Sequence, residues 1–496
     1  MKAAPSSEGS SGPSGDVSAG STPARAVDSI VRSGSYFTLR GLLQTGGPFL
    51  VASVAVVTLG KPDLASFVLL LSVASLAALT NPAISSVIYR FRDLTHPSDP
   101  TVSTFVVALV ASCSTVTAVV AAALVGLEFA LPIFLLAMFS GLSTAVSADL
   151  GRMKMNTLVA QRTSLQALLV TGVGSATLLV GRNLHAYLLF TCVVNGFFCW
   201  WLVVDCHRVT PIHLVRRVQL SEVKSVLSHV AVILAWIPLV FITSGADVFF
   251  VKAFDRERIA GYGIGVRIIA AAALPLTVAA SMIPPALVRR ELVRSPRLQF
   301  RHYSRIAGLA GTFSIALVSL LAPFVLSRLP IEAGAVPTPR VLAFVGLAVA
   351  IRGTWTAANL MMLQRGNHLR TLWPGSLETL VSVGVTVLAG RRWGEAGVAA
   401  GTLAGALASF AGYLFVCSRN DAIDTVGWRD VVSDLGPNIL ALALFGFAVV
   451  WSAPVVLPLV GGCSIYFLRK EVSALRSSVD ESRQDVADRF AGQPSC

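Results

Sequence analysis

Three arginines, Arg40, Arg267 and Arg352, lie within stretches of sequence that are otherwise apolar enough to cross a lipid bilayer. A charged side chain at membrane depth costs roughly 3 kcal/mol on insertion scales, so it usually faces a protein interior or a wet cavity and usually has a function. The planar guanidinium can bind phosphate oxygens through two parallel hydrogen bonds. The three arginines are therefore candidate ligands for an anionic substrate. Arg40 is the shallowest, and its side chain could instead reach the lipid headgroups.

Two carboxylates fall at depths that match two of these arginines. Asp247 lies near the end of one apolar stretch, and Arg267 lies about nine residues into the next, which brings their depths within roughly 6 Å. Arg352 and Glu378 both fall near the midplane of consecutive stretches. Each pair has two interpretations: a structural ion pair, or a site where the carboxylate binds a coupling H⁺ or Na⁺ and the arginine is freed for substrate.

The composition is that of a polytopic membrane protein. Of the 496 residues, 54% are hydrophobic and 13% are charged, whereas soluble domains average about 25% charged residues. The net charge of +13 does not indicate nucleic-acid binding, because the basic residues are spread between apolar runs instead of forming one face with interleaved aromatic residues. The seven cysteines are scattered without metal-ligand spacing, so no metal site is predicted.

Fourteen apolar runs are candidate membrane spans, most of which meet the requirement of about 20 residues per helix. They are residues 35–59, 63–89, 101–126, 128–148, 162–181, 184–204, 226–251, 258–286, 303–328, 337–362, 369–389, 396–417, 433–452 and the shorter run 453–468. Alternate connectors, beginning with the N-terminus, carry roughly twice as many Lys and Arg residues as the others. Cytoplasmic loops are enriched in these residues, so we expect both termini to be cytoplasmic.

The longest interior connector, the basic stretch 205–225, divides the spans into six before it and eight after it. A weak internal repeat relates the second span to the eighth, and repeats of equal topology imply a pseudo-twofold axis along the membrane normal. We therefore expect an all-α protein with a disordered cytoplasmic tail and two six-helix lobes, followed by an extra helix pair and a charged cytoplasmic tail. The disordered tail is 1–34, the two lobes are 35–204 and 226–417, the extra helix pair is 418–468 and the charged tail is 469–496.

The chain resembles the polysaccharide-type lipid flippases in three segments that occur in the family's order. The first two spans read GPFLVASVAVVTLGKPDLASFVLLLSVASLAALTNPAISSVIYRF, and a connector reads ADLGRMKMNTLVAQ. The third segment, SGADVFFVKAFDRERIAGYGIGVRI followed by PLTVAASMIPPALVRR, has an Asp before a short loop, a Gly-Tyr pair, an Arg and a late Pro. One departure is that Asn81 and Pro82 stand where the family more often has Asp and Gly.

The resemblance implies an alternating-access transporter in a bacterial cell membrane. Members of this family typically move a polyprenyl-diphosphate-linked oligosaccharide to the outer leaflet for cell-surface polysaccharide biosynthesis. The expected partners are that lipid-linked glycan, the bilayer, and a polysaccharide polymerase or glycosyltransferases. The wider superfamily also contains lipid II flippases and multidrug extruders, so the alternative is a cation-coupled exporter of small molecules.

Charge and motifs favour the lipid-linked substrate over the alternatives. An exporter of cationic drugs should present acidic and aromatic side chains to its ligand, but aromatic residues make up only 8% of the chain. We find no HExxH, GxSxG or P-loop motif and no long outer connector, so we predict no catalytic residues and no cofactor beyond a coupling ion.

Overall fold

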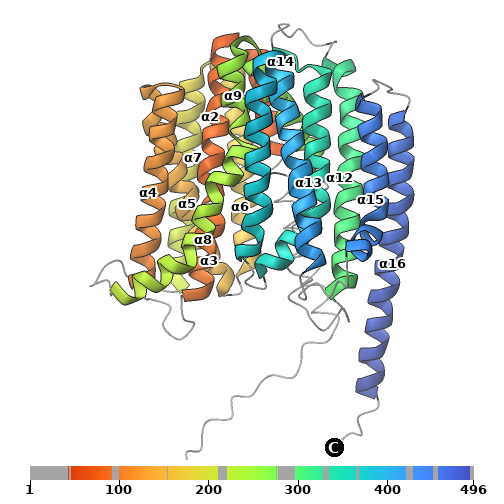
Figure 1. Cartoon of the computed structure of the whole chain (residues 1–496). Coiled ribbons are helices and arrows are strands. Elements are labelled where there is room, and N and C mark those ends of the chain that lie inside the picture. The colour runs from red at the N-terminus through yellow and green to blue at the C-terminus, as the bar shows by residue number, and fades with distance from the viewer. Residues whose placement is uncertain are drawn as a thin grey trace, which may run out of the picture.

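The computed structural model describes residues 46–91, 100–153, 155–209, 220–274, 296–326, 335–364, 368–419, 428–450 and 456–491, together with residues 43, 276 and 328. Within these ranges the protein is built from helices and contains no strand (Figure 1). Arg40 and the predicted tail 1–34 lie outside the described residues.

The first seven helices carry the N-terminal part of the bundle. They are Gly46–Thr58, α2 (Lys61–Leu79), α3 (Asn81–Phe91), α4 (Pro100–Leu124), α5 (Ala130–Arg152), α6 (Asn156–Gly181) and α7 (Leu184–Val209), with a short 3₁₀ turn at Leu127–Phe129.

The remaining helices carry the C-terminal part. They are α8 (Leu220–Ser244), α9 (Asp247–Phe254), α10 (Ile259–Ala272), α12 (Pro296–Leu326), α13 (Pro339–Gln364), α14 (His368–Ser418), α15 (Trp428–Val450) and α16 (Leu457–Ala491), with a 3₁₀ turn at Arg256–Arg258.

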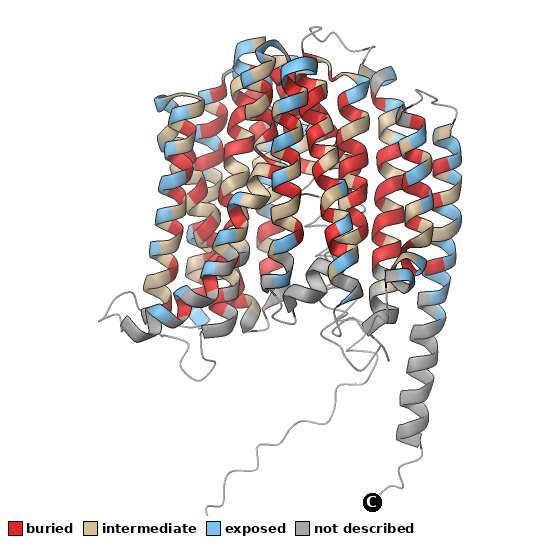
Figure 2. Ribbon diagram, viewed as in Figure 1, coloured by how far each residue is buried: buried red, intermediate tan, exposed pale blue. Residues whose placement is uncertain are grey.

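The helices have the length and apolarity of membrane spans. Seven of the described helices are long and apolar enough to cross a bilayer, and the number rises to eight if the bent pair α8 and α9 counts as one span. Large apolar side chains lie exposed on the perimeter of the bundle, among them Leu131, Val180 and Leu380, and the buried residues lie between the helices (Figure 2). A surface of this kind is stable only against lipid, so the chain is a multi-pass membrane protein.

We group the helices by their order in the chain into an N-lobe (Gly46–Thr58 and α2–α7) and a C-lobe (α8–α14). Within the N-lobe, α5 packs against α3, α4 and α7, and α6 packs against α7. Within the C-lobe, α13 packs against α12 and α14, and α14 packs against α8. The lobes meet where α2 contacts α9 and α10, and where α3 contacts α8.

The two ends of the bundle differ. The lower part of α16 projects beyond the other helices at one end (Figure 1), which we call the tail end; the sequence predicts it to be cytoplasmic. At the opposite end the two lobes are in close contact. There Gly263 of α10 faces Val68 of α2 so closely that an added Cβ would lie 2.0 Å from Cγ1 of the valine. Lys252 of α9 donates a hydrogen bond to the carbonyl of Leu124, the last residue of α4.

Two predicted spans are broken in the structure. The span predicted at 63–89 is interrupted at Thr80, whose hydroxyl donates to the Ala77 carbonyl at 2.7 Å, and α3 restarts with Pro82 in its first turn. The span predicted at 226–251 bends by 45° between α8 and α9. Both breaks follow local backbone chemistry, because proline lacks an N–H group and glycine at 245 lowers the cost of leaving the helix.

The helix α14 contains two predicted spans in succession. Residues 369–389 and 396–417 were expected as separate helices, and the chain reverses at Gly394, whose φ is +55° and ψ is −130°. This left-handed region is open to glycine at little steric cost. A side chain at this position would also meet Asp255, since an added Cβ would lie 2.5 Å from the carboxylate oxygen.

The helix pair α15 and α16 is fastened to α12 at the tail end. Glu471 of α16 accepts hydrogen bonds from Arg305 and from His302 of α12, the latter at 2.7 Å between Nδ1 and Oε2. Arg305 also donates to the carbonyls of Ser433 and Asp434 in α15. Residues 469–491, which belong to the predicted charged tail, continue α16 without a break to Ala491, because they contain no Gly or Pro to end the helix.

Candidate substrate site

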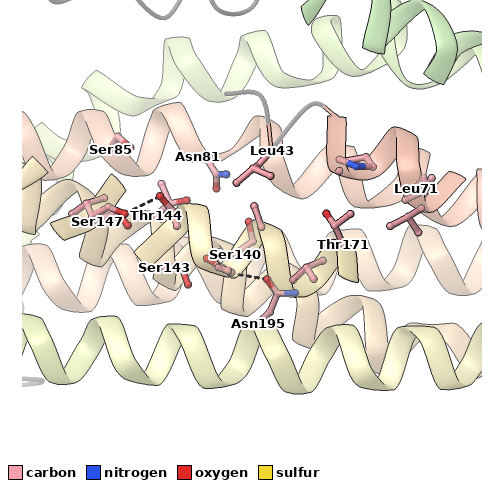
Figure 3. Close-up of a pocket in the computed structure, with 18 of the residues that line it drawn as sticks. Leu43, Leu71, Asn81, Ser85, Ser140, Ser143, Thr144, Ser147, Thr171 and Asn195 are labelled. Atoms are coloured by element: carbon pink, nitrogen blue, oxygen red, sulfur yellow. Dashed lines mark hydrogen bonds between the residues drawn. The ribbon is translucent and has the colours of Figure 1, made fainter. Parts of the chain in front are cut away.

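A cavity of about 550 Å³ lies within the N-lobe, between the first helix, α3, α5, α6 and α7. Hydroxyl and amide side chains line much of it, and none of the described residues that line it is charged. Figure 3 shows Asn81 and Ser140 facing this space from two different helices. We call this cavity the chamber.

Two local features of the sequence place these polar groups. In α5, Ser140, Ser143, Thr144 and Ser147 are spaced by three, one and three residues, so they lie on one face of the helix. The break between α2 and α3 puts Asn81 at the first position of α3, where it lines the chamber. Asn81 and Pro82, where the chain departs from the family that it resembles, therefore form the start of α3 at this break.

Two amide side chains that line the chamber, Gln166 and Asn195, are hydrogen-bonded to each other. Gln166 of α6 donates through Nε2 to Oδ1 of Asn195 at 2.8 Å, and Asn195 donates through Nδ2 to the Thr191 carbonyl at 2.7 Å. One other atom of a lining residue, Oδ1 of Asn81, is buried and has no hydrogen-bond partner within the described part of the protein.

A smaller, apolar cavity of about 220 Å³ adjoins the chamber. Ser140, Tyr187 and Asn195 line both cavities, and the rest of the smaller one is formed mainly by leucine, alanine and phenylalanine side chains. The ring of Tyr187 is held by an edge contact with Phe67, with 5.6 Å between ring centroids. The combined space is polar on one side and apolar on the other.

Arg267 lies in a different place, in an apolar cleft of about 310 Å³ between the first helix, α10 and α12. Three residues of this cleft, Val57, Leu321 and Val325, are about half exposed on the lipid-facing surface, at 58%, 48% and 53%. The first helix separates the cleft from the chamber: Gly47 and Val51 line the chamber, whereas Ala52 and Val56 line the cleft. One cation thus lies in an otherwise apolar opening to lipid.

Arg352 and Glu378 are brought together in the C-lobe. Arg352 donates through Nε and Nη2 to Oε1 of Glu378, at 2.8 Å and 2.7 Å, and the glutamate is 5% exposed. Nη2 also donates to the carbonyl of Thr243 at 2.8 Å, next to the break between α8 and α9. The N–H groups of Gly245 and Ala246 both bond to the Phe241 carbonyl. Carbonyls after Phe241, such as that of Thr243, therefore lack a helical N–H partner and can accept a hydrogen bond from Arg352.

Asp247 and Arg267 lie close enough to attract each other electrostatically, but within the described residues the direct side-chain partner of Asp247 is Tyr262. Asp247 lies in the first turn of α9 and accepts a hydrogen bond from the Tyr262 hydroxyl at 2.9 Å and one from the backbone N–H of Val248. Arg267 follows Tyr262 by five residues on α10, which at about 100° per residue turns the two side chains to different faces. Depth along a span predicts proximity but not rotation about the helix axis.

The predicted arginines have different direct contacts, although the charges of Arg267 and Arg352 both act on Asp247. Arg352 is held by Glu378 and Thr243, Arg267 lines the lipid-facing cleft, and Arg40 lies outside the described residues. Sequence reasoning missed the chamber altogether. The hydroxyl spacing in α5, inside an otherwise apolar span, was the signal that could have revealed it.

No protein-family model and no curated protein sequence matches this chain. Among solved structures, the lipid II flippase MurJ in an inward closed conformation aligns with a TM-score of 0.60 at 12% identity, covering 91% of this chain and 99% of that one. The MATE multidrug transporter DinF-BH, solved with a bound ligand, aligns with a TM-score of 0.54 at 13% identity, covering 80% and 97%. A MATE transporter in complex with MaL6 aligns with a TM-score of 0.53 at 16% identity, covering 80% and 96%.

The chain has the fold of MurJ and the MATE transporters. The alignment with MurJ includes a larger share of the chain than the alignments with the MATE structures. At these identities the similarity concerns the fold and leaves the substrate to be argued from the cavities.

Proposed function

We propose that this protein is an alternating-access transporter that moves a polyprenyl-diphosphate-linked oligosaccharide from the inner to the outer leaflet of a bacterial cell membrane, for cell-surface polysaccharide biosynthesis. Such a substrate has a hydrophilic head and a long apolar tail. It needs a polar cavity within the protein and, beside it, an apolar opening to the lipid.

The observation that carries this proposal is the position of the first helix between the chamber and the cleft. One face of this helix lines the polar cavity and another lines the lipid-facing opening that contains Arg267. Movement of this helix during transport would join the two spaces, so that the head occupies the chamber while the tail lies in the cleft, with Arg267 placed to bind a diphosphate oxygen. Arg40 is the other proposed diphosphate ligand, since it precedes the chamber-lining Gly47 by seven residues.

We assign ion coupling to the carboxylates of the C-lobe, Glu378 and Asp247. Both are buried, at 5% and 6% exposure, and Asp247 lies beside a break in a span, where transporters often place their substrate and ion sites. Binding of H⁺ or Na⁺ to Glu378 would weaken its attraction for Arg352 and release that guanidinium. An ion gradient or the membrane potential would then drive the conformational change.

The second candidate is export of small cationic molecules, which the similarity to MATE structures favours. The chemistry of the chamber disfavours it. Among the described residues that line the chamber there is no acidic side chain and only one aromatic ring, that of Tyr187. An organic cation would find neither a counter-charge nor an aromatic cage there.

We also propose that the protein catalyses no covalent reaction. The polar side chains of the chamber are hydroxyls and amides, and none of the chamber hydroxyls is accompanied by a histidine or carboxylate among the described lining residues that could activate it as a nucleophile.

The test is reconstitution of the purified chain into lipid vesicles that contain a fluorescent polyprenyl-diphosphate sugar. We expect the labelled lipid to cross the bilayer, and Arg267→Gln to slow crossing about tenfold or more, as loss of a charged hydrogen bond of roughly 1.5–3 kcal/mol predicts. The matched control is Arg391→Gln, which changes an exposed arginine. Failure of the lipid to move, together with export of a cationic dye, would overturn the proposal.

A further inference from the structure

The chamber differs from the rest of the site in the kind of polar group that it offers. Of its described lining residues, the polar ones are Asn, Gln, Ser, Thr and Tyr, with no Lys, Arg, Asp, Glu or His. Hydroxyls rotate and can donate or accept, and primary amides do both at once. Such a surface matches groups that are themselves both donors and acceptors, as sugar hydroxyls are.

The hydrogen-bonding capacity of the chamber is not used up within the protein. The Gln166–Asn195 bond engages one amide N–H and one carbonyl oxygen of this pair, and each amide has further capacity. Asn81 and Ser143 line the same cavity, and an amide and a hydroxyl can each both donate to and accept from ligand hydroxyls.

The same lining is unfavourable for a charged group. An ion that enters a buried cavity loses its hydration, and without a counter-charge the neighbouring dipoles recover only part of that loss.

The dimensions also fit a small glycan. The chamber of about 550 Å³ falls within the range of roughly 300–1,000 Å³ that holds compact ligands. The adjoining apolar cavity of about 220 Å³ is open to the same Ser140, Tyr187 and Asn195. It can take an apolar substituent, such as the methyl group of an acetamido or 6-deoxy sugar, while the hydroxyls remain in the polar part.

We propose that the chamber binds the uncharged, polyhydroxylated sugars next to the diphosphate and discriminates against sugars that carry a carboxylate or an ammonium group. This inference rests on the proposed function and narrows its substrate to lipid-linked glycans whose first residues are neutral. Asn81, Gln166, Asn195 and Ser143 are the residues that determine this specificity.

The experiment compares three fluorescent polyprenyl-diphosphate lipids in vesicles of phosphatidylethanolamine and phosphatidylglycerol. They carry N-acetylglucosamine, glucosamine or glucuronic acid, which are neutral, cationic and anionic. Crossing is followed by protection of the label from a membrane-impermeant reductant. With the unmodified protein we expect the neutral lipid to cross about tenfold faster than either charged one, a difference equivalent to about 1.4 kcal/mol.

A single isosteric substitution should change this preference. Asn81→Asp places a carboxylate in the chamber, so we expect it to slow the neutral lipid and to speed the glucosamine lipid, reversing their order. Gln166→Glu places a carboxylate in the chamber from α6, and it replaces Asn81→Asp in the test if that variant does not fold. The control is Asn183→Asp, an exposed residue whose side chain caps α7 by accepting the His185 N–H at 2.8 Å; aspartate is equally suited to that position.

The outcomes separate this inference from the proposed function. If all three lipids cross at similar rates, the neutral-sugar preference is wrong although lipid transport stands. If neither acidic variant changes the order while both remain folded, the chamber does not contact the sugar. If no lipid crosses while a cationic dye is exported, the proposed function itself fails.

Discussion

Arg352 and Glu378, which are 26 residues apart in the chain, form an ion pair with 2.7 Å between Nη2 and Oε1, in which the glutamate is buried and the arginine is partly buried. The arginine belongs to α13 and the glutamate to α14. Because Arg352 also donates to the Thr243 carbonyl of α8, one guanidinium connects three membrane helices. The pair is therefore either a permanent support of the C-lobe or a contact that must break during transport.

Removing one partner of this pair should destabilise the protein. Arg352→Leu leaves the Glu378 carboxylate buried without its counter-charge, a change that typically costs about 3–5 kcal/mol. We expect a clear fall in the melting temperature of the purified protein in detergent. The double variant Arg352→Leu/Glu378→Leu should recover most of that loss, because no unpaired charge remains. Equal melting temperatures for the single variant and the unmodified protein would contradict the prediction.

The conservative change Glu378→Gln tests coupling instead of stability. The amide keeps the size of the side chain and can still accept a hydrogen bond from Arg352, but it cannot bind H⁺ and binds Na⁺ weakly. We expect a folded protein whose lipid transport no longer responds to an imposed ion gradient. The measurement is the initial transport rate with and without that gradient, and an undiminished rate with unchanged ion dependence would exclude Glu378 as the coupling site.

Gly263 controls how closely the lobes approach at the end opposite the tail. An added Cβ would overlap Val68, at 2.0 Å from Cγ1, and valine cannot move aside because its χ1 rotation is restricted. We expect Gly263→Ala to shift the protein towards a form open at that end. The readout is the distance between spin labels at the exposed residues Asp63 and Glu257, which should lengthen.

A second glycine provides the control for this change. Gly384 also lies within a helix, α14, and an added Cβ there would meet nothing within 4 Å. Gly384→Ala should therefore leave the label distance unchanged and raise stability slightly, by up to about 1 kcal/mol from helix propensity. A similar lengthening in both variants would show that the effect is not due to contact with Val68.

The attachment of α16 should weaken in acid. Burial raises the pKa of Glu471, but the hydrogen bonds and positive charges of His302 and Arg305 outweigh it and hold the pKa of this carboxyl below its ordinary value of 4.5. A depressed carboxyl pKa stabilises the folded form above the unfolded value, and this stabilisation is lost as the pH falls through the folded value.

The corresponding measurement compares melting temperatures of the unmodified protein and Glu471→Gln between neutral pH and pH 3. We expect the variant to be less stable by about 1–3 kcal/mol at neutral pH, since Arg305 loses its charged partner. The gap should close as the pH falls below about 4.5. A gap that stays constant across the whole range would show that Glu471 titrates at its ordinary pKa.

The membrane fold was largely predictable because hydrophobic burial in a bilayer depends on composition and run length alone. The runs that became α4, α5, α6 and α7 agree with the predicted spans to within a few residues at most ends. The break at Gly245 was not predicted. An apolar run does not reveal where backbone hydrogen bonds are interrupted, since a neighbouring helix can satisfy the freed groups.

The site was predictable only in part, as Asp247 illustrates. Its depth suggested Arg267 as a neighbour, but its partner is Tyr262. Residue spacing along a span determines depth, whereas the rotation of each helix about its axis depends on how all of the helices pack. The chamber was missed for a related reason: serine and threonine in a membrane helix usually bond to their own backbone, so a polar face becomes a cavity only when other helices complete it.

The sequence by itself determined that this chain crosses a membrane many times through α-helices, and that a few arginines and carboxylates lie at membrane depth. Both conclusions follow from the free-energy cost of transferring polar groups into lipid, because that cost depends on each residue and not on its distant contacts. Only the tertiary structure decided that Arg352 meets Glu378, that Arg267 lies in an opening to lipid, and that Asn81 joins the hydroxyls of α5 around an uncharged chamber. These relationships depend on contacts between helices that are distant in the chain, and such contacts are set by packing of the whole bundle.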